Sequence, residues 1–269
     1  MGWKLGRPRF RLSTMVLLVA LCAAATWAGM NFLSPTRRLA RLLRPGQPAY
    51  LRREAASALG GVPSWEAEAA IDVLISTLGD PSPRVREYAI SALGTHGGRA
   101  RRAVPAILAE VGDPDRHVRY SACAVLGMVA PPDDRGPEHE EVVAALRKAL
   151  GDVDPMNRLV AGISLCQLGD AQSAASVLAL CATDPEDEVV AYQARIWIRR
   201  LKTTGPLAAA LVPLAVSEQP ARRRAALDLL IEFAAPETVV AALRGALEAD
   251  DPEIRRWAGE RLEALAPAP

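Results

Sequence analysis

The sequence predicts an all-α protein: a right-handed α-solenoid of about seven stacked helix pairs, preceded by one transmembrane helix. Three observations lead to this prediction. Hydrophobic residues make up 50% of the 269 residues but aromatic residues only 4%, and this composition disfavours a β-sandwich or barrel. Ala and Leu, which are strong helix formers, supply much of the apolar share. Finally, a motif recurs with a period of about 34 residues, and a long uncharged stretch lies near the start.

The first 35 residues divide into a basic tail, residues 1–11, and an uncharged apolar segment, residues 12–35. About 20 apolar residues suffice to cross a ~30 Å hydrocarbon layer. We therefore expect a transmembrane helix over 12–35 and a single-pass membrane protein. A short basic start directly before the apolar run favours a solenoid on the non-cytoplasmic side. The alternative is a cleaved signal peptide with its apolar core at 15–25, which would release an exported soluble solenoid.

Residues 36–269 carry the repeat, whose clearest part is the second helix of each unit. Segments 51–60, 85–94 and 118–127 read LRREAASALG, VREYAISALG and VRYSACAVLG. Each starts with an apolar residue followed by Arg and ends in Leu-Gly. More divergent copies place this starting position at 159, 189, 222 and 254. A long polar loop, 131–140, interrupts the spacing, and we interpret it as an exposed insertion, or alternatively as a recognition loop.

A second amphipathic segment lies between successive copies of this motif. Its apolar residues recur at i, i+3, i+4 and i+7, the spacing of one helix face. The segments are 69–80, 103–113, 140–152, 174–184, 207–216 and 237–250. The unit is thus helix, turn, helix. We expect the turn Asp of Asp80-Pro81 and Asp113-Pro114 to cap the second helix. The Gly of Leu-Gly should end that helix in the left-handed conformation. Stacking then buries faces that one pair leaves exposed.

The pattern D-P-x-x-x-V-R-x-x-A-x-x-A-L-G is carried by residues 80–94 and, with one change, by residues 113–127. It resembles the short HEAT-like repeats of bacterial proteins and phycobilin lyase subunits, and the resemblance covers roughly residues 36–266. In that family the turn Asp and the second-helix Arg form a ladder between neighbouring repeats. The resemblance therefore implies that Arg86 and Arg119 are structural.

Known catalytic patterns are missing. Deoxyhypusine hydroxylase, a HEAT-like enzyme, carries His-Glu pairs at the starts of its second helices, and the matching positions here contain no His. The sole His-Glu dipeptide, His139-Glu140, lies at a loop boundary. There is no nucleotide-binding or hydrolase motif, and the four cysteines form no C-x-x-C pair. We expect no enzymatic activity, cofactor or metal site. The alternative is a HEAT-like enzyme or enzyme subunit, either bilin-lyase-like or resembling a metal-dependent hydroxylase.

The expected function is that of a membrane-tethered, non-enzymatic scaffold that binds another protein and contacts the bilayer through 12–35. The net charge of +1 does not indicate nucleic acid, and we expect no small-molecule substrate. Positions two and three after the apolar start should point away from the core and line a binding groove. They are Arg53, Glu54, Glu87, Tyr88, Tyr120 and Ser121. Tyr88 and Tyr120 are the expected contact anchors, because Tyr combines a large apolar face with a polar tip.

Overall fold

The computed structural model describes residues 19–22, 34–130, 137–200 and 205–265. All regular structure in these ranges is helical, which confirms the all-α prediction. From residue 34 onward the described helices form seven consecutive pairs. They are α2 (Pro35–Leu42) with α3 (Ala49–Leu59), α4 (Ala67–Thr77) with α5 (Pro83–Thr95), α6 (Val104–Glu110) with α7 (Arg116–Val129), α8 (Pro137–Ala149) with α9 (Pro155–Gln167), α10 (Ala171–Ala182) with α11 (Glu188–Ile198), α12 (Gly205–Leu211) with α13 (Pro220–Phe233), and α14 (Pro236–Ala246) with α15 (Pro252–Leu265).

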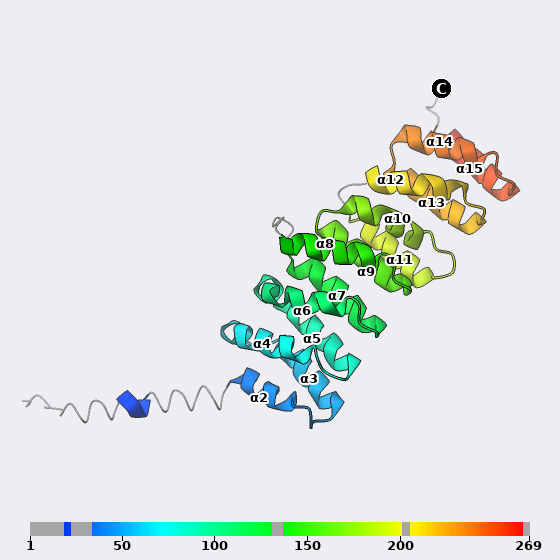
Figure 1. Cartoon of the computed structure of the whole chain (residues 1–269). Coiled ribbons are helices and arrows are strands. Elements are labelled where there is room, and N and C mark those ends of the chain that lie inside the picture. Colours follow the sequence, from blue (N-terminus) through cyan, green and yellow to red (C-terminus); the bar gives the residue numbers. More distant parts are fainter. Residues whose placement is uncertain (1–18, 23–33, 131–136, 201–204, 266–269) are drawn as a thin grey trace, which may run out of the picture.

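The pairs stack in chain order into an elongated solenoid (Figure 1). The second helices, from α3 to α15, lie along one side of the stack, and the first helices lie along the other. Three short 3-10 segments, η1 (Ser64–Glu66), η2 (Gly97–Ala103) and η3 (Val212–Val216), adjoin the first helices. Successive second helices α3, α5, α7 and α9 pack directly against one another. The face that these second helices turn away from the core is called the second-helix face below.

The core repeats with the sequence. Leu59, Leu93, Leu126 and Leu165 each lie seven residues after the arginine near the start of their own second helix, and all four are fully buried. Burying one such side chain contributes about 2 kcal/mol. A single pair cannot enclose these leucines, because each lies between two neighbouring pairs. The stack is therefore stabilised cooperatively along its length.

The prediction of a membrane-spanning helix over 12–35 is not borne out. Within this segment the structure describes residues 19–22, which are helical, and residues 34 and 35. At the other end of the segment, Ser34 caps α2 by accepting the N–H of Arg37 at 3.3 Å, so the solenoid has already begun. Nowhere in the described ranges is a helix both long and apolar enough to span a bilayer. The single-pass membrane assignment, with its solenoid outside the cytoplasm, is therefore wrong. Residues 12–18 and 23–33, like the basic tail 1–11, lie outside the described residues.

The turn before each second helix differs in detail from the prediction. Asp113 does not cap α7; its Oδ1 accepts the N–H of Asp115 at 2.7 Å, an Asx turn. Asp115 is the cap and accepts the N–H groups of His117 and Val118. Asp80 likewise accepts the N–H of Ser82 at 2.8 Å. The motif Asp thus shapes the turn through Oδ1, and its carboxylate can still accept hydrogen bonds from another partner.

The prediction that the Leu-Gly glycines end their helices in the left-handed conformation is wrong for the three clearest copies. Positive φ occurs, among described glycines, at Gly97 and Gly169. Gly94 and Gly127 lie inside α5 and α7. A Cβ on Gly94 would lie 2.9 Å from Val125 Cγ2, and one on Gly127 would lie 2.7 Å from Ser164 Oγ. These glycines therefore allow successive second helices to approach closely.

The fourth and fifth pairs follow a register that the sequence pattern misplaces. Arg158 Nη1 donates to the carbonyl of Asp152 at 2.9 Å, as Arg119 Nη1 does to the carbonyl of Asp113. Asp152 is thus the motif Asp of the fourth pair, and the start position expected at Leu159 falls on Asn157, a buried polar residue. In the fifth pair the buried residue is Val190, at 1% exposure, whereas Val189, the predicted one, is 65% exposed.

Candidate binding surface

The six predicted groove residues lie along α3, α5 and α7, but they do not share one environment. Arg53 lies over the Tyr88 ring, with its Cζ 5.5 Å from the ring centroid. Arg53 also pairs with Glu54 at 2.5 Å, and Glu87 pairs with Arg84 at 2.8 Å. Ser121 is buried, so the prediction that it points away from the core is wrong.

Tyr120 is the predicted residue that lines a hollow. This hollow, called the central groove below, encloses about 410 Å³ between α7, α9 and α11. Its lining consists of His117, Tyr120, Met156, Leu159, Val160, Ile163, Val189, Gln193 and Trp197. A second hollow of about 450 Å³ adjoins it toward the turns and shares His117, Tyr120, Met156 and Val189 with it. The floor of the central groove is made of buried aliphatic side chains, and its rim is aromatic or exposed.

Sequence reasoning found Tyr120 and missed the other groove residues. The shifted register of α9 and α11 hides them, since the predicted start positions 159 and 189 are displaced by one or two residues from the true ones. The spacing of Val189, Gln193 and Trp197, four residues apart on α11, is the signal that marks this exposed helix face.

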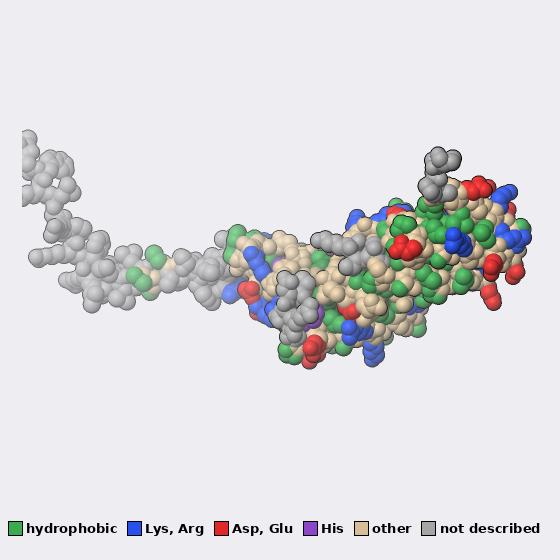
Figure 2. All heavy atoms as spheres, turned by 90° about the horizontal axis from the view of Figure 1, so that it is seen from above, with side chains coloured by type: hydrophobic (Ala, Val, Ile, Leu, Met, Phe, Trp, Pro, Cys, Tyr) green, Lys and Arg blue, Asp and Glu red, His purple; other side chains and the backbone are tan. Residues whose placement is uncertain are grey.

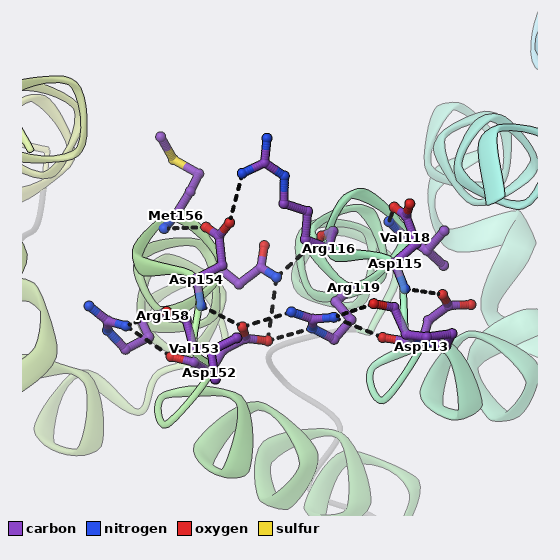
Figure 3. Close-up of polar contacts among 12 residues, drawn as sticks. Asp113, Asp115, Arg116, Val118, Arg119, Asp152, Val153, Asp154, Met156 and Arg158 are labelled. Carbon is purple, nitrogen blue, oxygen red and sulfur yellow. Dashed lines mark hydrogen bonds and ion pairs between the residues drawn. The ribbon is translucent and has the colours of Figure 1, made fainter.

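Next to this surface, along the turns, the structure contains the ladder that the resemblance implied (Figure 3). Arg119 on α7 donates two parallel hydrogen bonds to Asp152 of the next pair, Nε to Oδ2 at 2.7 Å and Nη2 to Oδ1 at 3.0 Å. Arg86 binds Asp113 in the same way, at 2.9 Å and 2.9 Å. Arg52 binds Asp80 at 2.7 Å and 2.9 Å. Bidentate pairs fix orientation as well as distance, so the ladder sets the stacking of the first four pairs. The structural role expected for Arg86 and Arg119 is confirmed.

The ladder ends after the fourth pair. Arg158 donates only to backbone carbonyls of its own turn. The next motif Asp, Asp184, instead lies 3.8 Å from Arg222. Further along, Arg223 donates to the carbonyl of Ser217, and its Nη1 is buried without a hydrogen-bond partner in the described part of the chain. The fifth and sixth pairs are joined by a different ion pair, in which Arg199 at the C-terminal end of α11 donates to Glu232 on α13 at 2.8 Å and 3.1 Å.

The carboxyl group of Glu110 lies beside the ladder, and its pKa is raised. Glu110 Oε2 lies 3.7 Å from Arg86 Nε, but burial, together with a hydrogen bond to Asp113 and its charge, raises the pKa of Glu110 to about 7. Unfolding returns the pKa to about 4.5. Between these values the folded state holds a proton that the unfolded state lacks, so stability falls as pH rises from 4.5 to 7 and the loss is complete above 7.

Glu110→Gln should therefore remove this loss of stability. Relative to the parent chain, the variant should gain about 1–2 kcal/mol on going from pH 4.5 to pH 8, or roughly 2–6 °C in melting temperature. Melting curves recorded by circular dichroism across this pH range test it. Glu141→Gln, an exposed carboxyl on the neighbouring helix α8, is the control and should show no such trend. Parallel pH profiles for Glu110→Gln and the parent chain would contradict the assignment.

Two features of the described residues bear on catalysis: the cysteine thiols and the grouping of side chains that could bind a metal ion. Burial raises the pKa of Cys123 to about 12 and those of Cys166 and Cys181 to about 11, so these thiols stay protonated and are poor nucleophiles at neutral pH. In the described ranges no three His, Cys, Asp or Glu side chains are grouped so that they could hold a metal ion. Figure 2 shows basic and acidic side chains interspersed over the face in view.

Stacked helix pairs with a regular Arg–Asp ladder and a groove across successive second helices define a helical-repeat protein of the solenoid class. The family model for HEAT repeats matches residues 36–109, 71–137 and 104–197. These segments together cover more than half of the chain, which therefore belongs to the HEAT-repeat family. The structure extends the same helix pairs beyond this region to residue 265.

Several solved structures are similar to this chain. No curated protein matches the chain. The CpcE–CpcF complex of phycocyanin lyase from Nostoc sp. is 22% identical, with 87% of this chain and 95% of that one covered and a TM-score of 0.49. A designed armadillo repeat protein is 18% identical, with 85% and 99% covered and a TM-score of 0.44. Human deoxyhypusine hydroxylase in complex with glycerol is 18% identical, with 87% and 98% covered and a TM-score of 0.33. With TM-scores below 0.5, none of these likenesses says what the chain does.

Proposed function

We propose that this protein is a non-enzymatic interaction scaffold that binds a segment of another protein in the central groove. The observation that carries this proposal is the composition of the groove. Three successive second helices expose apolar side chains around one hollow, and among them Val189 is 65% exposed and Tyr120 is 40% exposed. Large apolar groups gathered at one place on a surface are typical of sites that a partner covers.

The groove is suited to a peptide segment. Val160 and Ile163 form a buried floor against which an apolar side chain of the partner can be desolvated. Tyr120 and Trp197 stand at its rim, and these residue types contribute strongly to binding when a partner buries them. Gln193 and His117 supply hydrogen-bonding groups for a backbone in the same hollow.

The alternative of a HEAT-like enzyme or enzyme subunit has no specific observation in its favour here. A hydroxylase-like activity needs converging metal ligands, and a nucleophilic mechanism needs an activated side chain. The described residues in and around the groove are mostly aliphatic and aromatic. We therefore keep the scaffold as the proposed function and treat turnover of a substrate as the result that would displace it.

A charge placed in the groove should weaken the binding of peptides strongly. Short random peptides displayed on phage are selected on the full chain, and their affinity is measured by fluorescence anisotropy. Val189→Glu should weaken the selected peptides at least roughly tenfold, because a carboxylate would have to be desolvated by an apolar side chain. Val216→Glu in η3 is the matched control, since Val216 is also 65% exposed but does not line the groove. Equal loss in both variants, or none in either, would contradict the proposed site.

A further inference from the structure

Three arginines in the last three helix pairs lie over tryptophan rings. Arg200 Cζ is 5.3 Å from the centroid of Trp197, which lines the central groove. Arg224 and Arg261 lie over Trp257, at 5.6 Å and 5.7 Å. In the described part of the chain, none of these three guanidinium groups forms an ion pair, whereas their neighbours Arg199, Arg222 and Arg256 do.

On α13 the repeat places one of these arginines, Arg224, in register with the groove residue Tyr120. Arg224 follows Arg223 directly, as Tyr120 follows Arg119, and both Arg223 and Arg119 donate to the backbone of their own turn. Asp228 lies five residues after Arg223, as Ile163 of the groove floor lies five residues after Arg158. The repeat register thus carries the second-helix face from the groove onto α13, and Arg224 and Arg261, both over Trp257, link α13 to α15.

Stacking leaves these guanidinium groups prepared for a ligand. The ring attracts the flat face of the cation and restricts its movement, while the N–H groups at its edge remain available for two parallel bonds to a carboxylate. The charges of Arg224 and Arg261 act on Asp228, which lies four residues after Arg224 on α13. Burial raises the pKa of Asp228, and the charges of Arg224 and Arg261 oppose this effect. Within the described residues neither Arg224 nor Arg261 forms an ion pair with Asp228, so each guanidinium group keeps N–H groups for a further carboxylate.

We propose that the bound segment is an acidic peptide, with an apolar side chain in the central groove and Asp or Glu side chains paired with Arg200, Arg224 and Arg261. This inference rests on the proposed function. It adds that the bound segment is acidic and that its acidic side chains lie on one side of its apolar side chain, toward α13 and α15. A peptide fits better than a nucleic acid, because Asp228, Glu232 and Glu260 lie on the same helices α13 and α15. An unbroken row of phosphates would meet these carboxylates, whereas a peptide can space its own charges between them.

The test determines the content of Asp and Glu in the peptides that are selected on the full chain. Selected sequences should be enriched in Asp and Glu on one side of an apolar residue. Replacing those acids by their amides should weaken binding about tenfold. The double variant Arg224→Gln, Arg261→Gln should weaken the acidic peptide by a similar factor and leave its amide version unchanged. Arg41→Gln with Arg244→Gln, which removes the same charge from exposed positions on α2 and α14, should change affinity less than twofold.

The outcomes separate this inference from the proposed function. Peptides that bind the groove without an acidic preference, or that are insensitive to the Arg224 and Arg261 substitutions, overturn the acidic partner and leave the scaffold standing. A selection that enriches no peptide overturns both. A thymidine oligonucleotide that binds through Arg224 and Arg261 while acidic peptides do not would show that the surface serves a nucleic acid instead.

Discussion

Asp152→Ala should lower the free energy of unfolding by about 3 kcal/mol. Asp152 accepts both bonds of Arg119 and also the N–H of Asp154 at 2.8 Å (Figure 3). The two side chains of the pair are only 15% and 9% exposed. Removing the carboxylate leaves the guanidinium group of Arg119 half-desolvated with no anionic partner, and this costs more than the pair itself contributes. Urea denaturation followed by circular dichroism measures the loss.

Asp184→Ala is the matched control, because Asp184 occupies the same position one pair later without a bidentate arginine. It accepts the N–H of Glu186 at 3.0 Å, and its nearest arginine lies at 3.8 Å, so we expect a loss of about 1 kcal/mol or less. A double-mutant cycle with Arg119→Met isolates the coupling between Arg119 and Asp152. Similar losses for the two aspartates would show that the turn, and not the ladder, accounts for the stability.

The same pair makes a pH prediction of the opposite sign to that of Glu110. The hydrogen bond and charge of Arg119 hold the pKa of Asp152 below its usual value. The stability from this pair is therefore complete above the unfolded pKa of about 3.9 and is lost as pH falls through the lower folded pKa. Below that point the parent chain and Asp152→Ala should converge in stability. A difference that persists unchanged into acid would contradict this account.

Gly127→Ala should lower the free energy of unfolding by about 2 kcal/mol. Alanine is the better helix former, so intrinsic propensity predicts the opposite sign. In the structure, however, a Cβ at this position would lie 2.7 Å from Ser164 Oγ and 2.8 Å from Ser164 Cβ on the adjacent helix α9. Ser164 is itself buried and donates to the carbonyl of Cys123 at 2.9 Å. Space for the methyl group therefore requires α7 and α9 to move apart.

Gly245→Ala separates the two effects. Gly245 lies inside helix α14, and a Cβ there would meet nothing within 4 Å. This variant should gain about 0.5–1 kcal/mol from helix propensity alone. Thermal unfolding of the two variants under identical conditions should thus give shifts of opposite sign. If Gly127→Ala is also stabilising, the close approach of α7 and α9 is not what requires glycine at this position.

The fold could be read from the sequence because its determinants are local and repeated. The apolar spacing of each segment sets a helix and its buried face, and the seven-residue step from Arg52 to Leu59 or from Arg86 to Leu93 recurs at Arg119 and Arg158. The resemblance to HEAT repeats added the ladder, which the structure confirms at Asp80, Asp113 and Asp152. The membrane span was a prediction from apolar composition alone, and the helices of the described residues do not support it.

The binding surface depended on the tertiary structure. Tyr120 was visible in the pattern, but Val189, Gln193 and Trp197 come together with it only after the register of α9 and α11 shifts by one or two residues. Such a shift depends on packing against neighbouring helices, which bury Val190 and leave Val189 exposed. The sequence by itself thus determined the stack of helix pairs, and the resemblance to HEAT repeats supplied the Arg–Asp ladder, because both rest on contacts that repeat with the motif. Only the tertiary structure decided which side chains stay exposed around the groove and which arginines lie over tryptophan, because those depend on side chains from several pairs meeting in space.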